Sequence, residues 1–440
     1  MTLEVTYFGT SFATTSSALV FDRPGHVIYR PDVPTAVDVL AHFEKNKDTR
    51  WIVYEPHAVA RCFSDTRGGA GGGMPIFPEG SRRFENGWPA IPGHESYGTL
   101  IAGSDAALKI LEKRGIKKGD YVVGDINIGC GECGNDLRGG PPICCEEGTV
   151  FAGIGTMPEA ENWLLRQTGR KHLPGAYVGP GGFMLFPIEN IYPIPQQALY
   201  QGLPLAIFTQ ADGLACAYGM LDKVRPALGM MNENHHPTIL FFGAGNLGFK
   251  HGFVFQDALP RARLLFADPN EGNLTKLGDA LGIPQEQRYL LELQNPGRYT
   301  RSELITGFSC LQEIRKNENE KPINAIIDCS GRLTAEDFNQ LAQGLLAGGG
   351  CIATDALSLE GIVDVTSELM LVGQRFFASS ATPLNNIPRS TDLLLRKGAL
   401  LANSLSELPE SIENPDLPAI IAGEVDLGDR PGCTFYTQLR

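Results

Sequence analysis

From about Leu203 onward, short apolar runs alternate with segments that are long enough to form helices. The apolar runs are Thr238–Phe242, Arg263–Ala267, Ala325–Cys329, Cys351–Thr354 and Arg375–Ser379. Short apolar strands separated by crossover helices are typical of a parallel sheet with helices on both faces. The pattern therefore predicts an α/β domain with a doubly wound parallel sheet over residues 203–380.

The first half of the chain has a different pattern. Short β-like runs at Trp51–Tyr54, Tyr121–Val123 and Met184–Phe186 are separated by loops rich in glycine and proline. This pattern predicts a mostly β domain over residues 1–202. The alternation of strands and helices is lost again near the end of the chain, and we expect residues 381–440 to return to the first domain.

Composition and charge limit the classes of partner. A chain of 440 residues with 42% hydrophobic content is long enough for two domains of ordinary size. Its formal charge of -13 disfavours nucleic acid and anionic membrane surfaces, because both attract clustered positive charge. No apolar run approaches the roughly 20 residues of a membrane span. The N-terminus lacks the basic start and apolar core of a signal peptide. We expect a soluble, cytoplasmic protein that acts on a small molecule.

A glycine-rich loop follows the first apolar strand of the second half. Thr238–Phe242 runs into Gly243-Ala-Gly-Asn-Leu-Gly248, and a helix is expected from Phe249 to Leu259. The three glycines suit a tight turn, a close approach of backbone to a pyrophosphate, and close packing of helix on strand. The N-terminal N–H groups of the helix favour the phosphates. The sequence predicts a dinucleotide site in this loop, against the alternative of an α/β turn that binds nothing.

Asp268 ends the next strand, twenty residues after Gly248. A carboxylate at this place accepts hydrogen bonds from ribose hydroxyls and repels a 2′-phosphate, and no Arg or Lys follows at once to neutralise one. We therefore favour NAD over NADP as the cofactor. The predicted cofactor-binding residues are Gly243, Gly245, Asn246, Leu247, Gly248 and Asp268.

Candidate metal ligands lie in three separate segments of the first half. The first segment holds Cys62 with Ser64 and Asp65, and the second holds His94 and Glu95. The third is a Cys-rich stretch; it contains Cys130, Cys133, Asp136, Cys144 and Cys145. Cysteine and histidine suit zinc, and a catalytic zinc has three protein ligands and one open position. The alternatives are a packed core thiol for Cys62 and an ordinary turn residue for His94.

These motifs resemble the medium-chain dehydrogenase/reductase superfamily, of the zinc-dependent alcohol or polyol dehydrogenase type. The resemblance runs in order through nearly the whole chain from about Trp51. It rests on Cys62-x-Ser64-Asp65, Gly93-His94-Glu95, Lys118-Gly119-Asp120-Tyr-Val-Val, Gly181-Gly182-Phe183 and Gln210-Ala-Asp212. The resemblance implies a Rossmann doubly wound sheet beside a mostly β, GroES-like catalytic domain. It also suggests a homo-oligomer, a dimer or a tetramer.

The resemblance further implies roles for individual residues. Zinc held by Cys62, His94 and Asp212 would lower the pKa of a bound alcohol, whose hydride passes to the nicotinamide. Ser64 would take the hydroxyl proton and pass it towards solvent. Asp65 and Glu95 would orient the ligands. The predicted catalytic set is Ser64, Cys62, His94 and Glu95.

Two positions and two segments depart from the family pattern. Asp212 stands where Glu or Cys is usual, and it could instead cap the helix that follows, with Cys216 as a reserve ligand. Arg67 stands where a relay histidine is common, so a relay would have to end differently. The first 50 residues and the insertion from Glu146 to Pro180 have no counterpart in the resemblance.

The Cys-rich stretch resembles the lobe that holds a structural zinc in some family members. Cys130, Cys133 and Cys144 fall on three of the four expected cysteine positions, and Asp136 occupies the remaining one. Cys145 could substitute if the loop shifts. The hypothesis is a structural zinc on Cys130, Cys133, Asp136 and Cys144; the alternative is a decayed lobe with free thiols.

The leading hypothesis is a zinc- and NAD-dependent dehydrogenase that interconverts a secondary alcohol, such as a polyol, sugar or cyclitol, and its ketone. One alternative is a zinc-free reductase of the same fold, acting on an enone or enoyl compound. Another is a dinucleotide-binding protein without catalytic activity.

Overall fold

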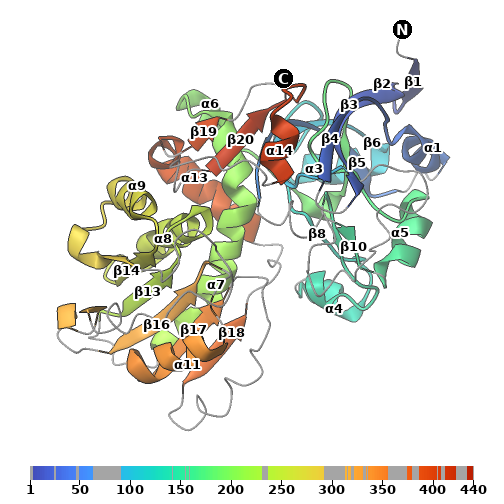
Figure 1. Ribbon diagram of the computed structural model, residues 1–440. Helices are drawn as coiled ribbons and strands as arrows, with labels where there is room; N and C mark the ends of the chain where they lie inside the picture. The colour runs from blue at the N-terminus through green and yellow to red at the C-terminus, as the bar shows by residue number, and fades with distance from the viewer. Residues whose placement is uncertain are drawn as a thin grey trace. The chain divides into compact units, whose positions relative to one another are not determined.

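The structure is a computed structural model of the whole chain. It describes residues 3–23, 26–45, 49–62, 91–140, 142–153, 155–157, 159–229, 236–291, 313–314, 316–318, 322–330, 333, 335–354, 374–378, 386–403, 405–407, 412–422 and 434–439. The chain divides into two compact units (Figure 1). Unit 1 comprises residues 1–212, 381–427 and 434–440, and unit 2 comprises residues 213–380 and 428–433.

Unit 2 is built around a parallel sheet of six strands. In spatial order the strands are β15 (Arg288–Leu290), β14 (Arg263–Asp268), β13 (Thr238–Phe242), β16 (Ile323–Asp328), β17 (Leu346–Thr354) and β18 (Arg375–Ala378). Every neighbouring pair in this sheet is parallel. Numbered by sequence, the order is 3-2-1-4-5-6, that of the doubly wound dinucleotide-binding fold. The predicted fold class is confirmed.

Helices flank this sheet. They are α7 (Ala211–Gly229), α8 (Asn246–Ala258), α9 (Glu271–Leu281) and α11 (Ala335–Gly344), with the short η5 (Gln285–Gln287). In Figure 1 the strands lie between α8 and α9 on one side and α11 on the other. Phe241 and Phe266 on adjacent strands stack with ring centroids 4.9 Å apart, and both are fully buried. Burial on both faces explains why these strands are continuously apolar.

Unit 1 contains a mainly antiparallel sheet of seven strands. The path runs β12 (Ile191–Pro193), β7 (Tyr121–Gly124), β6 (Glu95–Gly103), β5 (Trp51–Ala60), β20 (Thr434–Gln438) and β19 (Leu405–Glu407), while β11 (Met184–Pro187) also pairs with β5. The pairing of β20 with β5 is direct, with Tyr436 opposite Ala60. A C-terminal strand is therefore part of the same sheet as the first predicted strand of the chain.

The N-terminal residues form two β-hairpins that the hydrophobic pattern does not predict. The first pairs β1 (Glu4–Tyr7) with β2 (Thr10–Ala13), and the second pairs β3 (Thr15–Arg23) with β4 (His26–Pro34). β3 carries a run of buried side chains, Ala18 to Phe21, and so lacks the alternation that marks a strand with one solvent face.

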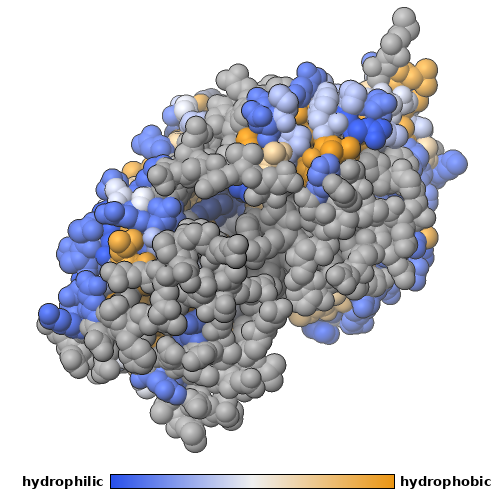
Figure 2. All heavy atoms as spheres, viewed as in Figure 1, coloured by the Kyte–Doolittle hydropathy of each residue, from blue (hydrophilic) through white to orange (hydrophobic). Residues whose placement is uncertain are grey.

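The remaining elements of unit 1 are helices, a small sheet and turns. They are α1 (Val37–Lys45), α3 (Asp105–Lys113), α4 (Gly134–Leu137), α5 (Ala160–Thr168), α6 (Gln196–Tyr200), α13 (Asn386–Ala402) and α14 (Leu417–Ala422), the small sheet β8 (Asn127–Ile128), β9 (Val150–Phe151) and β10 (Gly155–Thr156), and the turns η2 (Pro142–Cys144), η3 (Ile188–Asn190) and η4 (Leu205–Gln210). No helix in the described ranges is both long and apolar enough to cross a membrane. On the face shown in Figure 2, the coloured surface is mostly hydrophilic, with scattered hydrophobic patches.

Candidate active site

The glycine loop of unit 2 has the geometry that the motif requires. Gly243 has a φ of +96°, and its N–H donates to the carbonyl of Ala267 over 2.8 Å. A Cβ on Gly243 would lie 3.1 Å from the Ser330 nitrogen. A Cβ on Gly248 would overlap the carbonyl oxygen of Gly243. Both positions therefore need glycine for the turn itself.

Gly245 differs from its two neighbours in the motif. It is the N-cap of α8, with no side-chain cap, and its φ is -71°. A Cβ built there meets no atom of the described residues within 4 Å. Since neither strain nor packing within the protein requires glycine here, the open approach to the backbone fits a pyrophosphate at the N-terminus of α8.

Asp268 is held firmly at the end of β14. Its Oδ2 accepts a hydrogen bond from the Ala244 N–H over 2.6 Å. Its Oδ1 accepts from the Asn270 N–H over 2.8 Å and from the Asn273 side chain over 3.1 Å. The carboxylate thus fixes the glycine loop and lies where the sequence placed it, at the carboxyl end of the second strand of the fold.

In unit 1 the sheet register brings together the first two candidate ligand segments. β5 and β6 are antiparallel, with Ala60 opposite Glu95. Cys62 follows β5 by two residues, and His94 directly precedes β6. The end of β5 and the start of β6 lie side by side at the same end of the sheet. Side chains 32 residues apart in sequence therefore become neighbours.

The donor atoms of Cys62, His94 and Glu95 all lie within 4.8 Å of one another. His94 and Glu95 are buried, and Cys62 is partly exposed. A thiol, an imidazole and a carboxylate gathered in this way suit zinc with one open position. The residues present therefore fit a catalytic zinc. Glu95, expected to orient the ligands, lies within the donor group itself.

Asp212 is the second residue of α7 and is also buried, but it does not belong to this group of donors in the described chain. Its charge acts on a residue that the sequence analysis did not single out, Asp125. Asp125 follows β7, which pairs with β6 so that Val123 lies opposite Tyr97. Continued by two residues, that register places Asp125 opposite Glu95. Asp125 is thus a further acidic residue at the end of the sheet where the metal donors lie.

Asp125 is fully buried. Its Oδ1 accepts hydrogen bonds from the Asn127 backbone and side chain, over 2.9 and 3.0 Å, whereas Oδ2 has no hydrogen-bond partner among the described residues. Burial, with a contribution from the Asp212 carboxylate, raises the pKa of Asp125 to about 8. Nothing in the sequence around Asp125 marks it as a functional residue. Only the pairing of β6 with β7 shows that it lies near the metal donors.

Three residues named in the sequence analysis lie outside the described part of the chain: Ser64, the predicted relay hydroxyl; Asp65, expected to orient the ligands; and Arg67, at the position of a relay histidine. Cys216, the reserve ligand, lies on α7 and is partly exposed. It does not join a described group of metal donors.

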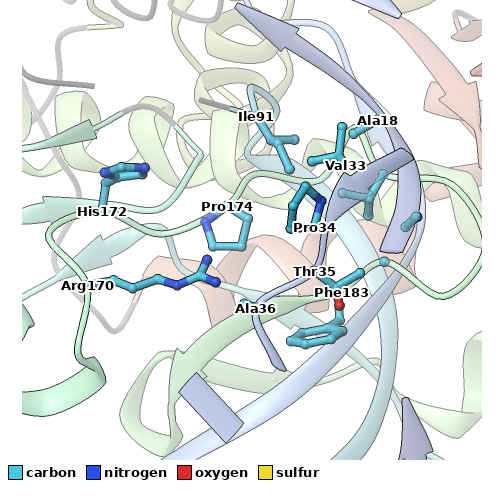
Figure 3. A pocket seen from close by; sticks show the side chains of 13 residues that line it. Ala18, Val33, Pro34, Thr35, Ala36, Ile91, Arg170, His172, Pro174 and Phe183 are labelled. Carbon is cyan, nitrogen blue, oxygen red and sulfur yellow. The ribbon is translucent and has the colours of Figure 1, made fainter. Parts of the chain in front are cut away.

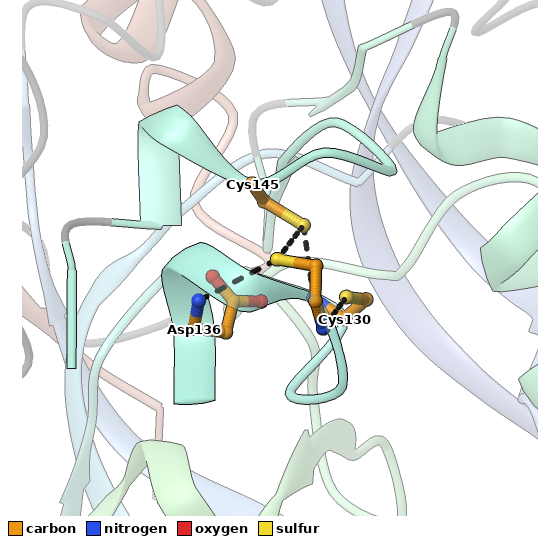
Figure 4. A group of neighbouring side chains, drawn as sticks. Cys130, Asp136 and Cys145 are labelled. Atoms are coloured by element: carbon orange, nitrogen blue, oxygen red, sulfur yellow. Dashed lines mark hydrogen bonds between the residues drawn. The ribbon is translucent and has the colours of Figure 1, made fainter. Parts of the chain in front are cut away.

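The Cys-rich stretch folds into a compact lobe, and Figure 4 shows three of its side chains turned towards one another. The donor atoms of Cys130, Cys133, Asp136 and Cys145 lie within 4.8 Å of each other, and the sulfurs of Cys133 and Cys145 are 4.0 Å apart. Two thiolates on one tetrahedral zinc, at about 2.3 Å each, are separated by about 3.8 Å. The spacing therefore suits a shared metal ion.

Backbone N–H groups point at the sulfurs of this lobe. Cys133 N–H lies 3.3 Å from the sulfur of Cys130, Asp136 N–H lies 3.4 Å from that of Cys133, and Cys130 N–H lies 3.2 Å from that of Cys145. Such donors stabilise the thiolate form that binds metal. The loop supplies these donors because each cysteine lies at a turn.

Among the described residues, the donor group of this lobe contains Cys145 in place of the predicted Cys144. Cys144 is exposed and ends the η2 turn, whereas Cys145 is buried and lies in the donor group. The spacing rule selected Cys144, but the one-turn helix η2 directs the next residue inwards. The substitute named in the sequence analysis is the residue that the fold brings into place.

A small pocket in unit 1 lies apart from both donor groups. Figure 3 shows Arg170 and His172 at one end of it and Val33, Pro34 and Phe183 at the other. None of the metal donors lines it. The Arg170 guanidinium donates from Nε to Asp38 over 3.1 Å and also pairs through Nη2 with the same carboxylate. The residues that line the pocket come mainly from the N-terminal hairpin and from the end of the insertion.

Comparisons with known proteins agree with this architecture. Residues 48–166 match the family of the alcohol dehydrogenase GroES-like domain. The chain has the medium-chain dehydrogenase/reductase fold of the alcohol dehydrogenases. The predicted resemblance is confirmed at the level of fold and of this domain, while zinc, the choice of NAD and the substrate stay predictions.

Solved structures of this fold cover almost the whole chain. One, described as a short chain alcohol dehydrogenase from E. coli CFT073 complexed with NADH, is 16% identical, with a TM-score of 0.66 over 97% of this chain and 99% of that one. Alcohol dehydrogenase TADH from Thermus sp. ATN1 is 16% identical, with a TM-score of 0.62 over 96% and 100%. The 2R,3R-butanediol dehydrogenase from Bacillus subtilis is 12% identical, with a TM-score of 0.63 over 96% and 99%. Together with the matched domain, these structures show that the chain shares the fold of alcohol dehydrogenases.

Proposed function

We propose that this protein is a zinc-dependent dehydrogenase that transfers hydride between NAD and a secondary alcohol or its ketone. The observation that carries the proposal is the meeting of Cys62, His94 and Glu95, whose donor atoms lie within 4.8 Å of one another. A set of three donors leaves the fourth position of a tetrahedral zinc open, as in catalytic sites, whereas structural sites are closed by four protein ligands.

Zinc held by Cys62, His94 and Glu95 would polarise a substrate oxygen, and NAD would accept or supply the hydride. The protein's own part is to bind and to orient. Burial of His94 and Glu95 limits the access of water to the donors, and the pairing of β5 with β6 holds their spacing. Asp212, predicted as a ligand, is proposed to act instead through its charge, which raises the pKa of the buried Asp125.

On the cofactor side, the open backbone at Gly245 and the uncapped N-terminus of α8 would receive the pyrophosphate. Asp268 at the end of β14 favours NAD, because a carboxylate held by backbone N–H groups would repel a 2′-phosphate. The substrate class proposed is a polyol, sugar or cyclitol. The butanediol dehydrogenase of this fold is consistent with that class.

The lobe of Cys130, Cys133, Asp136 and Cys145 is proposed as a second, structural zinc site. Its donors come from one stretch of 16 residues, and the site is closed by the fourth ligand. A metal there would stabilise a loop that has little apolar surface to bury.

A substrate panel tests the proposed activity. The purified protein, prepared without chelators, is incubated with NAD or NADP and with polyols, sugars, cyclitols and hydroxy acids, and the formation of reduced cofactor is followed. The expected result is oxidation of at least one polyhydroxy compound with NAD, abolished by a zinc chelator and restored by Zn²⁺. Chelator-resistant reduction of an enone would instead support the zinc-free reductase. Cofactor binding without turnover of any substrate would support the non-catalytic alternative.

A further inference from the structure

The His94 turn, residues 91–94, is enclosed by a segment from the end of the insertion. Gly175 N–H donates to the carbonyl of Ile91 over 2.9 Å, and Ala176 N–H donates to that of Gly93 over 2.8 Å. Tyr177 N–H donates to the carbonyl of Pro92 over 3.1 Å. The carbonyls of the three residues before His94 therefore each accept a hydrogen bond, and the donors are the three consecutive N–H groups of residues 175–177.

Close packing adds to these hydrogen bonds. Gly93 has a φ of +97°, and a Cβ built there would lie 2.7 Å from the ring of Tyr177. A Cβ on Gly175 would overlap the carbonyl of Pro92, and one on Gly153 would overlap that of Gly93. Three backbones therefore meet at the turn with no room for a side chain. Any shift of residues 175–177 is passed directly to the backbone that carries His94.

The same segment is held from its other side by the N-terminal hairpin. Leu19 N–H on β3 donates to the carbonyl of Tyr177 over 3.0 Å, and Gly179 N–H donates to that of Ser17 over 2.7 Å. Ala18 and Val178 form an antiparallel bridge between these bonds. The Ser16 hydroxyl adds a bond of 3.1 Å to the Gly179 carbonyl. The segment is thus a middle strand, with the hairpin on one side and the His94 turn on the other.

The hairpin lies outside the matched alcohol dehydrogenase domain, which begins at residue 48. It is nevertheless part of the core, because Leu19 and Phe21 of β3 are buried within the hydrophobic cluster of unit 1. Arg170 ties the insertion to Asp38 on α1, the helix that follows the hairpin. Two parts of the chain that have no counterpart in the resemblance therefore meet behind a proposed metal ligand.

We infer that the β3–β4 hairpin, acting through residues 175–179, positions His94 and thereby sets the affinity of the Cys62–His94–Glu95 group for zinc. The inference rests on the proposed function for the identity of the metal. Groups that orient metal ligands typically change metal affinity about 10- to 100-fold when they are altered. The hairpin and the segment are positioning elements, since neither supplies a donor atom to the group.

The test measures occupancy of this site without using activity. Zn²⁺ is titrated into the full-length, metal-depleted protein, and the alkylation of Cys62 is followed by peptide-resolved mass spectrometry. The zinc concentration that half-protects Cys62 reports the affinity of this group alone, whatever the Cys-rich lobe binds. Unfolding temperature is measured on the same samples.

Two matched pairs of variants are compared. Leu19→Ala in the hairpin is matched by Leu111→Ala on α3, since both leucines are fully buried in the core of unit 1 and α3 follows the opposite end of β6. Tyr177→Leu, which removes the ring against Gly93, is matched by Tyr177→Phe, which keeps it. We expect a roughly 10-fold or greater rise in the half-protecting zinc concentration for Leu19→Ala and Tyr177→Leu, and less than about 3-fold for their controls.

The outcomes separate the two claims. If zinc does not protect Cys62 in the unaltered protein, the proposed function fails. If zinc protects it there but Leu19→Ala and Leu111→Ala shift the half-protecting concentration equally, the inference is wrong and the proposed function stands. If Leu19→Ala does not fold, Tyr177→Leu against Tyr177→Phe decides whether the middle segment positions His94, and an equal response of that pair also overturns the inference.

Discussion

The two compact units build their candidate sites in opposite ways. In unit 2 the glycine loop and Asp268 come from one strand–loop–helix–strand stretch of 31 residues, Thr238 to Asp268. In unit 1 the donors Cys62, His94 and Glu95 lie at the paired ends of two separated strands. The turn before His94 is held by residues 175–177, and that segment is bonded in turn to β3 near Ala18. The first site needs only local structure, whereas the second exists only when distant parts of the chain have paired correctly.

The difference predicts how each site responds to change. A local site is damaged only by substitutions within it, while a site assembled from distant segments is also sensitive to substitutions in the elements that bring the segments together.

The largest effect is expected from removing a donor of the assembled site. Cys62→Ser keeps the volume but loses the thiolate, so alcohol oxidation should fall by roughly 10³-fold or more, because the stabilisation of developing charge by the metal is worth several kcal/mol. Cys216→Ser, at the reserve position, should change the rate by less than about 3-fold. Steady-state rates with NAD provide the comparison, and equal losses in both variants would return Cys216 to the ligand set.

The next effect concerns the local metal lobe. Cys145→Ser should lose one bound zinc and lower the unfolding temperature by about 5 °C or more, since metal binding in such a lobe is coupled to its folding. Cys144→Ser should do neither, because Cys144 is exposed and outside the donor group. Elemental analysis and thermal unfolding are measured on both. A loss of zinc with Cys144→Ser would restore the ligand set expected from spacing.

A smaller effect is expected in the glycine loop of unit 2, where one glycine is expected to affect cofactor binding and another to affect stability. Gly245→Val should weaken NAD binding about 10-fold or more, because its side chain would block the approach of the pyrophosphate, while the unfolding temperature changes by less than about 2 °C. Gly248→Ala should instead lower the unfolding temperature, since its Cβ would overlap the Gly243 carbonyl. Calorimetric titration and thermal unfolding test this; a Gly245→Val protein that binds NAD normally would exclude the pyrophosphate from this position.

The last prediction concerns Asp125 and depends on pH. Its pKa is raised from 3.8 to about 8, so the folded state holds the proton more tightly than the unfolded state. The stabilisation is therefore complete below about pH 4 and is lost as pH rises towards 8, by at most about 1.4 kcal/mol per pH unit. Asp125→Asn removes this dependence. In metal-free protein, the unfolding temperature of Asp125→Asn relative to the unaltered protein should rise between pH 5 and pH 8. A difference independent of pH would mean that Asp125 is already ionised in the fold.

The sequence was sufficient where structure is local. Apolar strands and glycine spacing predicted the parallel sheet, the turn at Gly243 and the place of Asp268, because these depend on residues close in sequence. The sequence was insufficient where the pairing of distant strands determines which residues lie together. Asp125 is identified only by the pairing of β7 with β6, and the N-terminal hairpins carry no alternating pattern. Cys144 was preferred to Cys145 because spacing does not report which way a one-turn helix directs its side chains.

The zinc content of the protein purified without chelators tests the central claim most directly. The account predicts two zinc ions per chain, one for each donor group, with one remaining in Cys62→Ser and one remaining in Cys145→Ser. Two zinc ions that both persist in Cys62→Ser would contradict the assignment of the Cys62–His94–Glu95 group. The absence of zinc from the unaltered protein would contradict the proposed zinc-dependent dehydrogenase altogether.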